Sequence, residues 1–195
     1  MRLRVALTTL GLAALVTGCG STPPSRFYTL RGTATPASAS SNVSVVVGPV
    51  SVPATVDRPQ IVLTTGANQV ALDEFHRWAS PLANNISRVV AENLVALLGT
   101  PRVTLSPQTL GADADFRAII EVQRFDSSLG DAALLDAVWT VRRAKDGKAE
   151  TGRTTVRETT PAKSYDDLVA AHSRALARLS QDISEAVRTL DGAGK

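Results

Sequence analysis

The stretch "SPLANNISRVVAENLVALLGTP", residues 80–101, has the pattern of one amphipathic helix. Ser80 is the expected N-cap with Pro81 at the first helical position, and Gly99 followed by Pro101 marks the end. The apolar residues inside it recur at three-four spacing: Leu82, Ile86, Val89, Val90, Leu94, Leu97 and Leu98. The opposite face carries polar residues: Asn84, Asn85, Arg88 and Glu92. We expect this helix to pack on a sheet.

Strand patterns lie on both sides of this helix. Before it, β-branched and alternating runs cover residues 26–30, 43–53, 59–65 and 69–78. Gly48-Pro49 requires a bulge or an edge position in the second run, because proline donates no ladder hydrogen bond. After the helix, strand patterns cover 102–106, 114–125, 133–143 and 148–160. Lys145-Asp146-Gly147 predicts a hairpin, and the last three runs predict an antiparallel meander.

A second helix closes the chain, from Ser164 to about Leu190. Ser164 and Asp167 form a capping box. The apolar stripe runs through Leu168, Val169, His172, Leu176, Leu179, Ile183, Val187 and Leu190. The order of strands, helix, strands, helix predicts an α+β fold, with a mostly antiparallel sheet and two long helices packed on one face.

The N-terminus has the layout of a signal peptide. Arg2 and Arg4 precede an apolar run, which ends in Val16-Thr17-Gly18-Cys19. This run is too short for a membrane span. The tetrapeptide resembles the bacterial lipobox, so Cys19 is the expected lipidation site; an ordinary secretory signal with an incidental cysteine is the alternative. We divide the chain into a signal peptide (1–18), an acylated tether with the first short strand (19–42), and one α+β domain (43–195).

Composition excludes several function classes. Cys19 is the only cysteine and there are two histidines, so an internal disulfide and a structural zinc cluster are excluded. Removing residues 1–18 removes two of the 21 Lys and Arg, which leaves 19 against 18 Asp and Glu. This near-neutral balance, without a clustered basic face, argues against nucleic-acid binding. No phosphate-binding or calcium-binding motif occurs, and we expect no cofactor and no metal.

The sequence offers no assembled catalytic motif. No G-x-S-x-G occurs, and His172 lies on the apolar stripe, where it is expected to be packed. Glu74 and His76 could serve acid-base catalysis in an envelope hydrolase. In a regular strand they share one face with Trp78, which is also the pattern of a solvated strand surface, and we favour that interpretation. We therefore expect no catalytic residue.

Four stretches together resemble a known family: "FYTL" (27–30), "VGPVSVPATVDRPQIVL" (47–63), "RWASPL" (77–82) and "LARLSQDISEAV" (176–187). They are similar to the PqiC family, the ABC-type transport auxiliary lipoproteins of the paraquat-inducible systems. Ser80 departs from the acidic residue common there. The resemblance implies a lipoprotein on the periplasmic side of the outer membrane. It would work beside a mammalian-cell-entry domain protein that carries lipid, and so maintain membrane integrity. An outer-membrane assembly lipoprotein is the alternative.

Three residues are candidate partner contacts. Asp57 and Arg58 precede Pro59 between two expected strands, where a rigid exposed loop could offer the Arg58 guanidinium to a carboxylate. A purely structural turn, capped by Asp57, is the alternative. Trp78 is either an interface anchor or a core residue under the first helix. The expected partners are the mammalian-cell-entry protein and the outer membrane, to which the acyl chains would attach the protein. Phospholipid and a second copy of the chain are further candidates.

Overall fold

The computed structural model describes residues 23–38, 40–106 and 114–192. Cys19 and the expected signal peptide, residues 1–18, lie outside them. The strands are β1 (Arg26–Tyr28), β2 (Val45–Ser51), β3 (Gln60–Gly66), β4 (Gln69–Trp78), β5 (Val103–Leu105), β6 (Phe116–Ser128), β7 (Ala132–Arg143) and β8 (Ala149–Thr159). The helices are α2 (Leu82–Leu98) and α3 (Tyr165–Gly192). No helix in the described ranges is both long and apolar enough to cross a bilayer.

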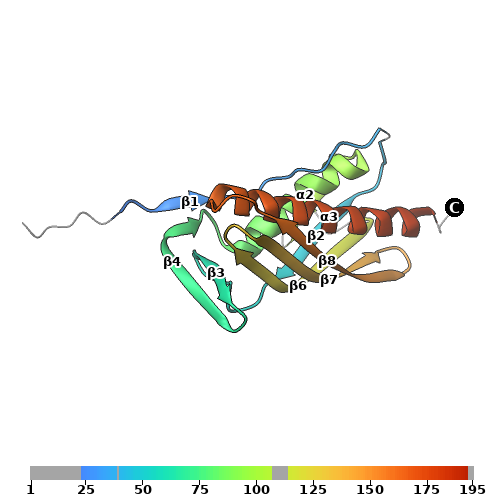
Figure 1. Cartoon of the computed structure of the whole chain (residues 1–195). Coiled ribbons are helices and arrows are strands. Elements are labelled where there is room, and N and C mark those ends of the chain that lie inside the picture. The colour runs from blue at the N-terminus through green and yellow to red at the C-terminus, as the bar shows by residue number, and fades with distance from the viewer. Residues whose placement is uncertain (1–22, 39, 107–113, 193–195) are drawn as a thin grey trace, which may run out of the picture.

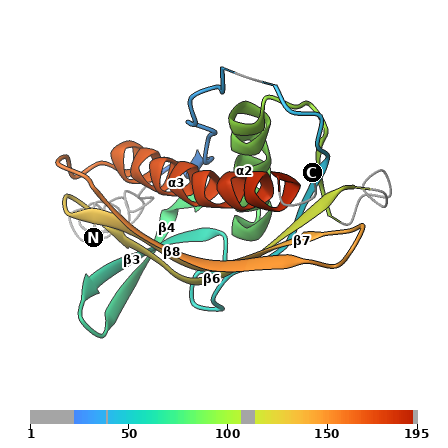
Figure 2. The ribbon, with the colours of Figure 1, turned by 90° about the vertical axis from the view of Figure 1, so that its right-hand side faces the viewer.

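The α+β class is confirmed, and both helices lie on the same side of a five-stranded sheet ordered β5-β2-β6-β7-β8 (Figure 2). The sheets are mixed instead of purely antiparallel. The β6-β7-β8 meander is antiparallel, but β2 pairs in parallel with both β5 and β6. The chain leaves β2 and returns to its sheet only after passing through α2, and such a long crossover permits parallel pairing. The register shifts between Val47 and Val50, which confirms a bulge at Gly48-Pro49.

The two helices follow the expected apolar stripes, with two corrections in α2. The helix begins at Leu82 with Pro81 as its N-cap, so Ser80 is not the cap. Pro81 has extended backbone angles, and its carbonyl accepts the first helical hydrogen bond, from the Asn85 amide at 3.0 Å. Asn85 is fully buried and not on an exposed face. Gly99 ends the helix in the left-handed conformation, as expected. In α3 the expected Ser164–Asp167 pair is present: the Asp167 amide donates to the Ser164 hydroxyl at 3.0 Å, and this hydroxyl donates to the Asp167 carboxylate at 2.6 Å.

A second, three-stranded sheet has the order β1-β4-β3. β3 and β4 form a hairpin that projects beyond the five-stranded sheet, and β1 pairs in parallel with the last residues of β4 (Figure 1). Its buried residues, among them Tyr28, Ile61 and Trp78, belong to the same hydrophobic core as those of the large sheet and the helices. The core therefore joins both sheets, and β1 sits beside the first turn of α3, where Tyr28 meets Tyr165.

Candidate functional site

The structure brings the three candidate partner-binding residues together around one surface hollow. Asp57, Arg58 and Pro59, from the β2–β3 connection, form one wall, and Trp78, Ser80 and Pro81, from the β4–α2 junction, form the other. The hollow measures about 290 Å³. The Trp78 amide donates to the Pro59 carbonyl at 2.7 Å, which fixes one wall against the other. The two walls are far apart in the sequence, so the hollow arises only from the tertiary fold.

The Asp57-Arg58 wall is rigid and presents free charges. The amides of Val56 and Asp57 both donate to the Pro53 carbonyl, and the Arg58 amide donates to the Val56 carbonyl. Both Asp57 and Arg58 are exposed. Among the described residues, neither charged side chain has a hydrogen-bond or ion-pair partner, so Asp57 does not cap its own turn. Backbone bonds hold the loop, and the Arg58 guanidinium is left available to an outside carboxylate.

Trp78 belongs mainly to the core. The side chain is 6% exposed, and its ring meets Phe125 edge-on, with centroids 6.2 Å apart and planes at 71°. Of the two expected roles, the indole therefore has that of a core residue in this structure. Its small exposed edge lines the hollow. A partner seated in the hollow would rest against a surface that the core holds in place.

The structure does not assemble Glu74 and His76 into an acid-base pair. Glu74 pairs with Arg77 at 3.6 Å and accepts a hydrogen bond from Gln60. His76 instead lies 3.0 Å from the Asp73 carboxylate and stacks on Tyr165 with centroids 3.8 Å apart. The hydroxyl of Tyr165 donates to Asp73 as well.

The expected solvated strand surface at His76 was therefore wrong. The register of the β3–β4 pair is interrupted here: Gln60 pairs with Arg77, but the next residue, Ile61, pairs with Asp73. The residues of β4 between Asp73 and Arg77 therefore bulge out of the ladder. Asp73 closes this bulge by accepting hydrogen bonds from the amides of Phe75 and His76, at 2.9 and 3.1 Å. The bulge breaks the alternation of faces and turns His76 toward α3.

Asp73 couples the stability of this junction to pH. Burial raises the pKa of its carboxyl, but hydrogen bonds from Tyr165, His76 and the Phe75 amide outweigh burial and lower the pKa to about 2, from an ordinary 3.8. A carboxyl with a lowered pKa in the folded state stabilises the fold above its unfolded pKa and loses this contribution as the pH falls. The affected window lies between about pH 4 and pH 2.

We predict that Asp73→Asn reduces the loss of stability between about pH 4 and pH 2, because the variant has no carboxylate to protonate there. Urea unfolding of both proteins across this range measures the effect. Tyr165→Phe, which removes one donor to Asp73, should shift the acid-sensitive range upward. Identical pH profiles for the wild type and Asp73→Asn would contradict the assignment.

His172 is packed, as expected. It is fully buried in α3, its ring stacks on Phe125 at 3.8 Å, and its Nε2 lies 2.8 Å from the Ser127 hydroxyl. Burial lowers the pKa of the imidazole to about 3, so it stays neutral at physiological pH. Ser127 is 2% exposed, so no substrate can reach this Ser–His pair. The pair links β6 to α3.

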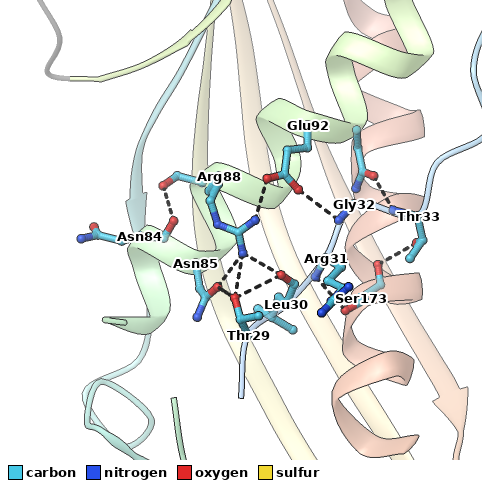
Figure 3. Close-up of polar contacts among 12 residues, drawn as sticks. Thr29, Leu30, Arg31, Gly32, Thr33, Asn84, Asn85, Arg88, Glu92 and Ser173 are labelled. Carbon is cyan, nitrogen blue, oxygen red and sulfur yellow. Dashed lines mark hydrogen bonds and ion pairs between the residues drawn. The ribbon is translucent and has the colours of Figure 1, made fainter. Parts of the chain in front are cut away.

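One feature that sequence reasoning missed is the clamping of the chain after β1 against both helices (Figure 3). Arg88 donates to the Leu30 carbonyl at 2.6 Å and to Asn85 at 2.9 Å, and pairs with Glu92 at 2.6 Å. The amides of Thr33 and Ala34 donate to the buried side chain of Asn93. The sequence did contain one signal for this contact. Asn93 lies between apolar positions of the helix stripe, and a buried side-chain amide needs hydrogen-bond partners from another segment.

The described residues contain no group of three His, Cys, Asp or Glu side chains that could hold a metal ion. What they do contain is a two-layer α+β domain, a clamped N-terminal segment and a hollow with free charges. These features define the chain only as an α+β domain with an exposed candidate contact surface. The family comparison gives a more specific class: the chain belongs to the ABC-type transport auxiliary lipoprotein component family, whose model matches residues 28–184.

Solved structures share the fold at low sequence identity. A crystal structure described as an uncharacterized protein superposes with a TM-score of 0.70 at 21% identity, covering 85% of this chain and 99% of that one. Protein XCC0632 from Xanthomonas campestris also reaches 0.70, at 17% identity, covering 87% and 100%. A comparison with curated proteins found no significant match.

Proposed function

We propose that this chain is a non-enzymatic outer-membrane lipoprotein that docks the periplasmic protein of a mammalian-cell-entry-type lipid transport system at the outer membrane. The observation that carries the proposal is the match of the transport auxiliary lipoprotein family to residues 28–184, nearly the whole folded domain. The lipid anchor is Cys19, and the domain faces the periplasm. Its task is to hold the partner in place and so maintain membrane integrity.

The hollow supplies the proposed partner contact. Arg58 is exposed, unpaired among the described residues and carried on a loop that backbone hydrogen bonds hold. Pro59, Pro81 and the edge of Trp78 offer apolar surface next to it. Rigid apolar contacts beside a free arginine are typical of interface hot spots, because little conformational entropy is lost on binding. The fitting partner segment carries a carboxylate next to an apolar side chain.

We predict that Cys19→Ser leaves the domain folded but releases it from the membrane fraction, because residue 19 precedes every described element of the fold. Fractionation of cells, with washing at high salt, measures the released share. The matched control is Ser21→Ala, which keeps the lipidated cysteine and should stay in the membrane fraction. If Cys19→Ser still sediments with outer membranes after the wash, acylation is not the attachment.

Affinity purification of the tagged chain from detergent-solubilised membranes tests the proposed function. Mass spectrometry should find a mammalian-cell-entry domain protein that is enriched relative to a control purification with an unrelated tagged lipoprotein. Enrichment of outer-membrane assembly proteins instead would favour the alternative class of lipoprotein.

A further inference from the structure

Phe27 is an exposed aromatic residue on a well-held strand. Its side chain is 63% exposed, the largest value among the exposed large apolar residues of the described chain. The neighbouring Tyr28 points the other way and is 9% exposed. β1 pairs with β4 in the register Phe27 to Arg77, and the residues after it are held by Arg88, so the phenyl ring is presented in a fixed position.

A groove of about 790 Å³ begins at Phe27 and runs along α3. Its helix side includes the small or apolar residues Val169, Ala170 and Ala177. Three arginines line it, of which Arg174 pairs with Glu158 at 2.8 Å and Arg178 with Asp182 at 3.1 Å.

The third arginine, Arg31, has no such pairing. Its amide donates to the Ser173 hydroxyl at 3.2 Å (Figure 3). Its guanidinium has no ion-pair partner among the residues described. The groove also contains two carboxylates, Glu158, which pairs with Arg174, and Asp166, neither of which forms an ion pair with Arg31. It therefore joins an exposed aromatic ring to a guanidinium that no carboxylate of its lining pairs with.

The position of this groove in the chain indicates what it faces. Phe27 follows Cys19 by eight residues, a length that spans at most about 28 Å. β1 lies at the first turn of α3, whereas the β7–β8 turn lies at the other end of the domain (Figures 1 and 2). The 28 residues of α3 separate these ends by about 42 Å. A chain acylated at Cys19 therefore keeps Phe27 close to the bilayer.

We propose that Phe27 and Arg31 form a second membrane contact, in addition to the acyl anchor: the phenyl ring inserts at the bilayer interface and the Arg31 guanidinium binds a phospholipid phosphate. Aromatic rings are favoured at this depth, and the planar guanidinium matches phosphate oxygens. The contact rests on the proposed lipid anchor. It orients the domain with the β7–β8 turn pointing into the periplasm, instead of leaving it free to rotate on its tether.

Brominated lipids test this contact, because they quench only indoles that touch them. The lipidated Phe27→Trp variant is reconstituted into vesicles of phosphatidylethanolamine and phosphatidylglycerol with brominated acyl chains. The native Trp78 and Trp139 are buried, at 6% and 7% exposure, and contribute a constant background. The matched control, Lys145→Trp, places an indole on the exposed β7–β8 turn. We expect loss of emission from position 27 and none from position 145.

The outcomes separate this contact from the anchor. If the lipidated chain floats with the vesicles but position 27 is unquenched, or both positions are quenched alike, the contact is overturned while the anchor stands. If the chain does not float, the anchor fails and the contact fails with it.

Arg31→Glu, added to the Phe27→Trp variant, tests the phosphate. It should reduce the quenching of the indole at position 27 without changing flotation. Unchanged quenching would show that Arg31 does not bind a lipid phosphate. The proposal would also be overturned if the indole at position 27 were covered by a protein partner in native membranes and were not quenched by lipid.

Discussion

Trp78→Ala is expected to lower the free energy of unfolding by about 3–5 kcal/mol, because truncating a buried aromatic side chain leaves a cavity. Trp78 is 6% exposed and meets Phe125 edge-on, and it closes the β4–α2 junction over the common core of the two sheets. Equilibrium unfolding in urea measures the change. The loss of stability appears as a lower urea concentration at the midpoint of unfolding, while the dependence of the free energy on urea concentration stays the same.

Val70→Ala is the matched control for this prediction. Val70 lies on the same strand, is apolar and is 57% exposed, so its truncation should cost about 0.5 kcal/mol or less. A similar small effect for Trp78→Ala would mean that the indole contributes to the hollow more than to the core, and the account of the junction would fail.

Arg58→Glu is expected to act on binding instead of stability. The guanidinium has no hydrogen-bond or ion-pair partner in the described part of the chain, so its replacement should change the unfolding free energy by about 0.5 kcal/mol or less. At an interface, however, the change removes an ion pair and creates a repulsion, which often costs several kcal/mol, or more than about a hundredfold in affinity. Titration of the proposed partner, a purified mammalian-cell-entry protein, with both forms of the chain measures this loss.

Lys145→Glu supplies the control for Arg58→Glu. It reverses one exposed charge on the β7–β8 turn, and it therefore matches the change in net charge away from the hollow. We expect it to bind the partner as the wild type does. If both variants lose affinity equally, long-range charge decides the association, and if Arg58→Glu unfolds the domain, the loop is structural.

The local elements could be predicted because their signals are local. Helix α3, with the Ser164–Asp167 pair at its start, and the β6-β7-β8 meander depend on spacing and turn chemistry within a few residues. The contact of the β4 bulge with α3 could not be predicted, because Tyr165, whose hydroxyl donates to Asp73, lies 92 positions further along the sequence. The parallel pairing of β2 was missed for the same reason, since nothing within a strand encodes which distant strand it meets.

The candidate site was predictable in its residues and not in its geometry. Arg58 next to Pro59, and Trp78 before a helix, stood out as residue types that bind partners. Their meeting across one hollow depends on the Trp78–Pro59 hydrogen bond, which no pattern indicates. The clamp around Leu30 was missed because Asn85 and Arg88 look like an ordinary solvated helix face until the N-terminal segment covers them.

Site-specific photo-cross-linking in living cells tests the docking role of the hollow most directly. A photoreactive residue at position 58 and a control at position 145, on the exposed β7–β8 turn, are compared in otherwise wild-type lipidated protein. If the hollow is the docking site, we expect a cross-link from position 58 to a mammalian-cell-entry domain protein and a weaker or absent one from position 145. A cross-link to that protein from position 145 alone, or from neither position, would contradict this docking role.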